Sequence, residues 1–325
     1  MGFLLAILAH RYVAFPIPGK VFWPYFAGTA ILFIGLVRII RAGSSQWRGI
    51  DGVAALGPLF FAIPLAVFGA DHFVASKVVA SIVPSWIPWH LFWAYFVGVA
   101  LLAAALSLVT QKHSLLASTL LSAMLFSFVL LIHVPNFVKN PHNRFFFALP
   151  LREMSFSAGA LARALAQADG WPKLRVKRLT ILARCAIAVP TVVFGVEHFL
   201  FPQFVPVIPL KQLVPSWIPG HVVLAYVTGA VLIACGLSII LNWRARQAAT
   251  LLGIAVFAIV LLVYLPIMAA NASDIGIGLN YFADTLMFSG SALLLSGILP
   301  SREFAKAPAA SRADSAARNG LFQGG

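Results

Sequence analysis

Charged residues are scarce in this chain. Asp, Glu, Lys and Arg make up 10% of its 325 residues, and only nine residues are acidic. A soluble globular domain carries about a quarter charged residues, so the composition excludes that class. Hydrophobic residues reach 61%, which is typical of a polytopic membrane protein. The sequence therefore predicts an all-α fold whose main partner is the lipid bilayer.

Cysteine and cofactor motifs are also nearly absent. Only Cys185 and Cys235 occur, and no Cys or His spacing suits a zinc site. The sequence has neither a glycine motif for dinucleotides nor His-Glu-x-x-His, so we predict no metal and no covalently bound cofactor. The formal net charge of +14 is expected in cytoplasmic loops of so apolar a chain, and it does not predict binding to nucleic acid.

Nine stretches have close to the about 20 apolar residues that a helix needs to cross a bilayer. They lie near residues 21–40, 53–71, 89–109, 114–133, 145–166, 179–199, 221–241, 247–268 and 277–299. The fifth stretch is the weakest, because Pro150, Arg152 and Glu153 interrupt it. The sequence predicts about nine transmembrane helices.

A tandem repeat organises these helices. Phe-Gly-Ala-Asp-His-Phe (68–73) recurs as Phe-Gly-Val-Glu-His-Phe (194–199), and Val-Pro-Ser-Trp-Ile-Pro-Trp-His (83–90) recurs with one change at 214–221. The offset grows from 126 to 131, which indicates a five-residue insertion after Phe199. Each unit holds four predicted helices, so the two units are parallel repeats.

The domain organisation follows from the repeat. The first unit covers residues 49–167 and the second covers residues 178–300. Residues 17–28 resemble 87–98, which predicts that 1–48 holds an isolated copy of the unit's second helix. Residues 301–325 lack apolar periodicity and predict a disordered cytoplasmic tail.

The distribution of basic residues predicts the orientation. Of the 23 Lys and Arg residues, 16 fall on one side of the nine helices and seven on the other. The positive-inside rule makes the first side cytoplasmic. The N-terminus and both Val-Pro-Ser-Trp-Ile-Pro loops are then outside, and the C-terminus is inside.

Ionisable residues within the predicted spans are the candidate site residues, because such groups are costly in a membrane. The first unit contributes Asp71, His72, His90 and Glu153, and the second contributes Glu197, His198, His221 and Asp284. Further candidates for ligand contact are His133, its counterpart Tyr264, and the loop residues Trp86 and Trp217. Helix ends place most of these groups near the outer interface, so we expect one outward-facing pocket in each unit.

A structural reading of the same residues stays open. His and acidic side chains at helix ends can bind unpaired backbone groups, and Trp is common where a helix meets the membrane surface. For His90 and His221 the two readings are equally supported. For Glu153 and Asp284, which lie deeper in the predicted spans, a functional role is favoured.

The four-helix unit resembles the DoxX-like family of bacterial membrane proteins, which includes the DoxD-type subunit of thiosulfate:quinone oxidoreductase. The resemblance covers about residues 55–165 and 180–300 and rests on Phe-Gly-x-acid-His-Phe, Pro-Ser-Trp-Ile-Pro-x-His and Ala-Tyr-x-x-Gly. It implies a helical bundle in the bacterial inner membrane, with a link to quinones. This chain fuses two units and has no soluble redox domain, so thiosulfate oxidation does not transfer to it.

Two functions follow as hypotheses. The first is the membrane subunit of a quinone-linked oxidoreductase that works with a soluble or membrane-bound redox partner and holds quinone at the acid and His pockets. Paired carboxylates and imidazoles suit proton transfer to a quinone. The second is a non-enzymatic scaffold or small-solute carrier in which the same residues are structural.

Overall fold

The computed structural model describes residues 19–42 and 49–300, which are largely helical and form no strand beyond one isolated bridge. Eight of the described helices are long and apolar enough to cross a membrane. A helix lies at each of the nine predicted stretches, and the fifth, α9 (Arg144–Leu165), is the one that is not among the eight candidate spans. The predicted all-α polytopic membrane fold is confirmed. The predicted tail at 301–325 and the chain before residue 19 lie outside the described residues.

The two halves have the same order of long helices. The first half contains α4 (Gly57–Val74), α5 (Ser76–Ile82), α6 (His90–Thr110), α7 (Ser114–Phe128), η2 (Val129–His133), α8 (Val134–Lys139) and α9. The second contains α10 (Lys173–Leu200), α11 (His221–Ile240), α12 (Ala245–Ile259), η3 (Val260–Tyr264), α13 (Leu265–Ala270), η4 (Ile275–Asn280) and α14 (Tyr281–Ile298). The halves differ in α5, which only the first half has, and in η4, which only the second half has. The π-helical segments η2 and η3 are both followed by a proline, Pro135 and Pro266. The element bounds therefore recur at the same spacing as the sequence.

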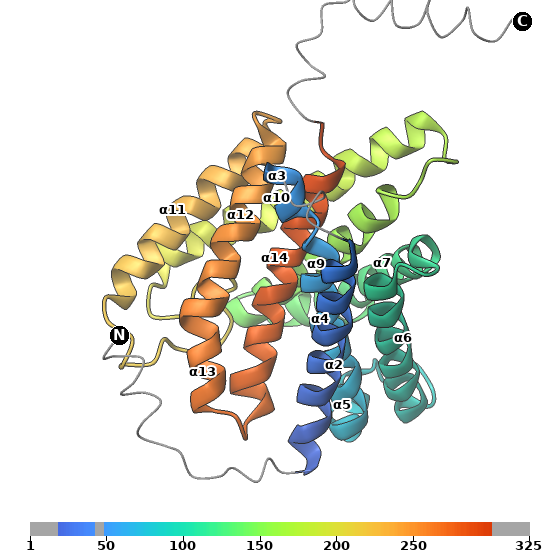
Figure 1. Cartoon of the computed structure of the whole chain (residues 1–325). Helices are drawn as coiled ribbons and strands as arrows, with labels where there is room; N and C mark the ends of the chain where they lie inside the picture. Colours follow the sequence, from blue (N-terminus) through green and yellow to red (C-terminus); the bar gives the residue numbers. More distant parts are fainter. Residues whose placement is uncertain (1–18, 43–48, 301–325) are drawn as a thin grey trace, which may run out of the picture.

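The eight long helices of the two units form a closed ring, and two of them, α9 and α14, also contact each other across its centre. Within the first unit α4 packs on α6, α6 on α7 and α7 on α9, and the second unit repeats this order with α10, α11, α12 and α14. The ring closes because α9 packs on α10 and α14 packs on α4, while α9 and α14 touch each other. Figure 1 shows α14 in the middle, with α11 and α12 on one side and α6 and α7 on the other. The fourth helix of each unit thus joins the two units.

Close helix packing within each unit depends on a matched pair of glycines. A Cβ added at Gly98 would lie 3.1 Å from the carbonyl oxygen of Gly69, and one added at Gly229 would lie 2.8 Å from that of Gly195. Small residues let membrane helices approach closely, so the first and second helices of each unit are in near backbone contact. This contact fixes the acid and His pair that follows Gly69 or Gly195.

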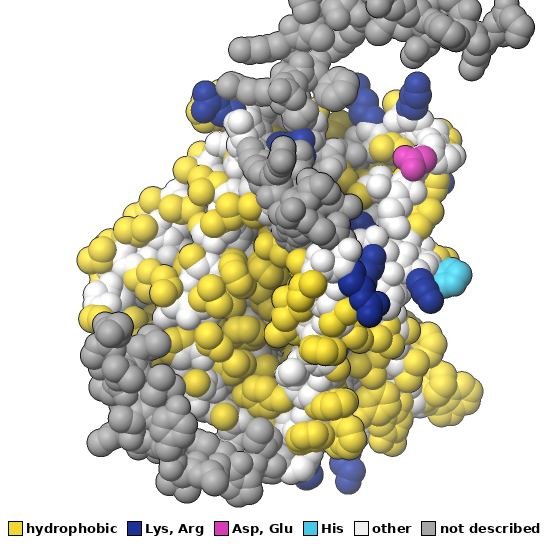
Figure 2. Space-filling model, in the orientation of Figure 1, with side chains coloured by type: hydrophobic (Ala, Val, Ile, Leu, Met, Phe, Trp, Pro, Cys, Tyr) yellow, Lys and Arg dark blue, Asp and Glu magenta, His cyan; other side chains and the backbone are white. Residues whose placement is uncertain are grey.

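The outer surface of the bundle is hydrophobic. Large apolar side chains are exposed on several helices, for example Phe33 at 67%, Leu120 at 61% and Leu262 at 75%. Figure 2 shows hydrophobic side chains over most of one face, with Lys and Arg mainly toward one end. The additional helix α2 (Gly19–Ala42) packs outside the ring against α4 and α6, and the short α3 (Gly49–Ala54) touches α12 and α14. A surface this apolar is stable in lipid, and the chain is an integral membrane protein.

Candidate site: a cavity in the first unit

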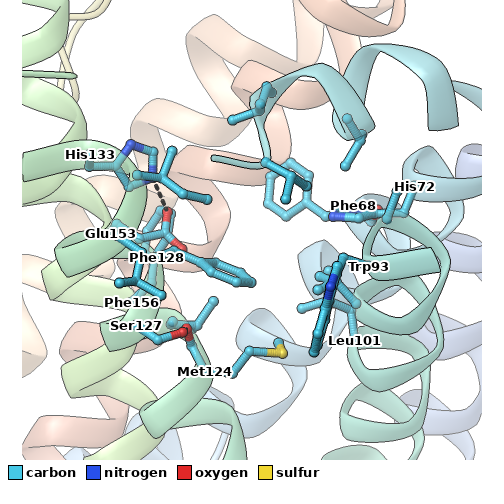
Figure 3. Close-up of a pocket in the computed structure, with 18 of the residues that line it drawn as sticks. Phe68, His72, Trp93, Leu101, Met124, Ser127, Phe128, His133, Glu153 and Phe156 are labelled. Carbon is cyan, nitrogen blue, oxygen red and sulfur yellow. Dashed lines mark hydrogen bonds and ion pairs between the residues drawn. The ribbon is translucent and has the colours of Figure 1, made fainter. Parts of the chain in front are cut away.

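A cavity of about 680 Å³ lies in the first unit, among α4, α5, α6, α7, η2, α9 and the start of α14. Most of its wall is apolar, and its polar residues are Asp71, His72, Ser127, His133, Arg152, Glu153, Asn280 and Asp284. Figure 3 shows His133 and Glu153 on one wall and Phe68, His72 and Trp93 on the opposite wall. Phe96 and Leu131 line the cavity and are 50% and 42% exposed, so the cavity reaches the surface of the bundle.

An ion network forms one polar part of this cavity. The Arg152 guanidinium donates a hydrogen bond to the Asp284 carboxylate at 2.9 Å and another to the Glu153 carboxylate at 3.3 Å. His133 Nε2 lies 3.9 Å from Glu153 Oε2. Glu153 and Asp284 occupy equivalent positions in the two units, and both are buried. Arg152 therefore links the two units, because it pairs with one carboxylate from α9 and one from α14.

Local structure explains how the histidines reach the cavity. Asp71 and His72 lie in the last turn of α4, and His72 Nδ1 is 2.7 Å from the carbonyl oxygen of Phe68. Because a carbonyl oxygen only accepts, Nδ1 of His72 is the protonated nitrogen. His133 is the last residue of η2, and π-helical insertions of this kind often occur at functional sites.

Several buried polar atoms of this cavity have no hydrogen-bond partner among the described residues. They are Asp71 Oδ1, His133 Nδ1, Arg152 Nε and Asn280 Oδ1. The Asp71 carboxylate has the Asn280 side chain as a neighbour, whereas His133 Nδ1 and Arg152 Nε have no such partner in the part of the chain that the structure describes. Buried polar groups in native proteins are nearly always paired, so these two atoms call most strongly for a partner from outside the chain. A ligand with polar atoms, or water, would satisfy them.

The equivalent space in the second unit is filled by the chain itself. Residues 201–213, which include the five-residue insertion, form an irregular loop rather than a helix and carry Val205, Val207 and Ile208 into the interior at no more than 1% exposure. The backbone N–H of Val207 donates to His198 Nε2 at 2.9 Å, and the Tyr264 hydroxyl donates to the carbonyl oxygen of Pro206. The expectation of two open pockets is therefore corrected, because the insertion occupies the second.

The first unit holds this plug segment (201–213) in place through Arg144. Its guanidinium donates to the carbonyl oxygens of Pro209 and Leu210 and lies 3.7 Å from the centre of the Phe204 ring. It is also 3.9 Å from Glu197, whose carboxylate is buried beside the plug. Ile275 stands where the second unit would carry the counterpart of Arg144. In the first unit, α5 lines the cavity through Val79 and Ile82 and does not fill it.

The predicted residues divide into three groups. Asp71, His72, His133, Glu153 and Asp284 line the cavity. Glu197, His198 and Tyr264 are buried around the plug and do not line the cavity. The four others do not line the cavity, since His90 and His221 begin their helices and Trp86 and Trp217 are 70% and 38% exposed. His90 and His221 are therefore not among the residues that form this cavity.

Several cavity residues were not among the predicted site residues, and Arg152, Asn280 and Trp93 are three of them. Arg152 could have been found, because a basic residue next to Glu153 within an apolar helix is itself an ionisable group that needs a partner. Asn280 and Trp93 carry no comparable signal, since amide and indole groups are common at helix starts.

Comparisons of the chain with family models, curated proteins and solved structures return no match. Within residues 19–42 and 49–300, no three His, Cys, Asp or Glu side chains are grouped so that they could hold a metal ion. The geometry of the cavity is therefore the main guide to function.

Proposed function

We propose that the protein is a quinone-binding membrane subunit whose single open site is the cavity of the first unit. The observation that carries this proposal is the combination of apolar walls with unpaired buried polar atoms. Small-molecule sites are concave, mostly apolar and about 300–1,000 Å³ in volume, with a few polar groups that orient the ligand. The cavity of about 680 Å³ matches that description.

A quinone suits both parts of the cavity. Its planar ring would lie between Trp93 and Phe128, which face each other from opposite walls in Figure 3. Its oxygens would meet the polar groups of His72 on one side and of His133, Arg152 and Glu153 on the other. An isoprenoid tail would leave past Phe96 and Leu131 into the lipid, because both side chains are exposed there.

Proton transfer is the chemistry that these residues supply. Glu153 is within 3.9 Å of His133 and hydrogen-bonded to Arg152, so a proton could pass between a ligand oxygen, the imidazole and the carboxylate. In this proposal a soluble or membrane-bound redox partner exchanges electrons with the bound quinone, as the resemblance to DoxX-like proteins implies. The same proposal places the chain in the bacterial inner membrane, with the cavity toward the outer side.

A cavity-filling variant tests the proposal. Ser127→Trp places an indole in the cavity, whereas the control Ala258→Trp places one at the equivalent position of α12, which is exposed. We expect wild type and Ala258→Trp to bind a short-chain benzoquinone and Ser127→Trp to lose binding, measured by quenching of tryptophan fluorescence and by extraction of co-purified quinone. Absence of quinone binding by wild type would refute the proposal.

The second candidate function is a non-enzymatic scaffold, and the Arg152 network favours it. Arg152 joins Glu153 of the first unit to Asp284 of the second, which is an arrangement that could serve assembly alone. A scaffold predicts that Glu153→Gln lowers stability and leaves the cellular function intact once the protein is folded. The quinone proposal predicts that the same folded variant loses function.

A further inference from the structure

The plug of the second unit shows what kind of group the repeated site accepts. Its contacts with His198 and Tyr264 come from a single amide group, because the carbonyl oxygen of Pro206 and the N–H of Val207 belong to one peptide bond. That amide lies between the two side chains with its N–H directed at His198. The chain's own segment thus acts as a built-in occupant of the second site.

The hydrogen-bonding state of His198 follows from its two partners. Its Nδ1 is 2.5 Å from the carbonyl oxygen of Phe194, so Nδ1 carries the proton. Its Nε2 accepts the N–H of Val207, which requires a neutral ring with a free lone pair on Nε2. The occupant of this site must therefore present a hydrogen-bond donor to the His.

His72 is held in the same way in the first unit. Its Nδ1 faces the carbonyl oxygen of Phe68, four residues earlier, as Nδ1 of His198 faces that of Phe194. The neutral ring again leaves Nε2 as an acceptor, and no described residue donates to it in the first unit, where α5 lines the cavity without filling it. A lone pair on His72 is therefore available to whatever occupies the cavity.

We propose that the first cavity selects ligands that carry a hydroxyl group for His72 Nε2, and that it therefore holds the quinol in preference to the quinone. This inference rests on the proposed function and specifies the redox form that binds. A quinone oxygen has only lone pairs, so it would face the lone pair of Nε2 without a hydrogen bond. A quinol donates one hydroxyl to Nε2, as Val207 N–H does in the second unit. Its second oxygen would lie toward His133, which occupies the position of Tyr264.

A preference for quinol also predicts the direction in which the bound quinone reacts. A site that binds quinol more tightly than quinone stabilises the reduced form, so it favours quinone reduction when a partner supplies electrons. It also raises the potential of the bound couple relative to the couple in the membrane, because the tighter-bound form is the reduced one. Glu153 and His133 would then supply protons on the wall opposite His72.

The test compares three probes of the same ring and chain: a short-chain benzoquinone, its quinol under anaerobic reducing conditions, and the dimethyl ether of the quinol. The ether keeps the shape and both oxygens but has no donor. For wild-type protein in lipid nanodiscs we expect the quinol to bind about tenfold more tightly than the quinone and the ether, as the gain of one hydrogen bond to an acceptor in a mostly apolar cavity implies.

Two variants locate the effect. His72→Phe is expected to bind all three probes with similar affinity, whereas His90→Phe, which changes a histidine outside the cavity, is expected to keep the tenfold preference. Equal binding of quinol and ether to wild type would overturn this inference and leave the proposed function standing. Binding of none of the probes to wild type would overturn the proposed function and this inference together. The comparison within wild type needs no variant, so it remains decisive if His72→Phe does not fold.

Discussion

Removal of the Arg152 guanidinium is the sharpest test of how the two units are joined. In Arg152→Met the carboxylates of Glu153 and Asp284 lose the hydrogen bonds of 3.3 Å and 2.9 Å that pair them with a cation. The side chains of the two acids are only 9% and 10% exposed, so water replaces little of the lost interaction. Breaking a buried ion pair by removing one partner costs about 3–5 kcal/mol. We expect the free energy of unfolding to fall by that amount.

The assay is reversible unfolding by SDS titration in mixed micelles, followed by circular dichroism. Arg175→Met removes an exposed arginine, which stacks on Trp171, and serves as the control with an expected change of at most about 0.5 kcal/mol. Adding Asp284→Asn to Arg152→Met removes one of the two uncompensated charges and should recover part of the loss. A change below about 0.5 kcal/mol in Arg152→Met would refute the view that this network joins the units.

Three further predictions concern the plug and the helix contacts. Arg144→Gln removes the hydrogen bonds from Arg144 to the plug, so the backbone amides of residues 205–212 should exchange hydrogen at least about tenfold faster. The amides of α6 serve as the control and should exchange at an unchanged rate. Unchanged exchange in the plug would show that Arg144 does not hold it in place. Tyr264→Phe leaves the Pro206 carbonyl without its donor and should lower the free energy of unfolding by about 1–3 kcal/mol in the same SDS titration without weakening quinone binding. Weaker quinone binding in Tyr264→Phe would show that the region around the plug contributes to the site. Gly229→Ala places a Cβ 2.8 Å from the carbonyl oxygen of Gly195 and should lower the free energy of unfolding by about 1–3 kcal/mol. A variant as stable as wild type would show that α10 and α11 do not pack as closely as this distance implies.

The helices and the repeat could be predicted from sequence because each depends on local composition. Apolar stretches of membrane length indicate helices, and the motif around Asp71 and His72 recurs around Glu197 and His198 with little change. The ring arrangement could not be predicted from sequence, because sequence does not tell whether the fourth helix of a unit, α9 or α14, also packs on the other unit. Here α9 packs on α10, and α14 packs on α4.

The site could be predicted only in part. The sequence indicated the acids and His72, since ionisable groups are rare in membrane spans. It also indicated the insertion near Pro206, but sequence does not reveal that the inserted residues turn inward and fill the second site. His90 and His221 follow Trp89 and Gly220, which have φ values of 59° and 65°, and these left-handed residues turn the chain just before each histidine. Such a local turn depends on the folded loop and has no simple sequence pattern.

The central claim is that one cavity, that of the first unit, holds the quinone-class ligand. Photo-crosslinking with an azido-substituted short-chain quinone, followed by mass spectrometry of the labelled peptides, tests it most directly. We predict labelling in the segments that line the cavity, namely those around Phe96 in α6 and around Met124 and Phe128 at the end of α7, and competition by unlabelled quinol. Competed labelling of the equivalent segments of α11 and α12, with none in α6 and α7, would contradict the claim.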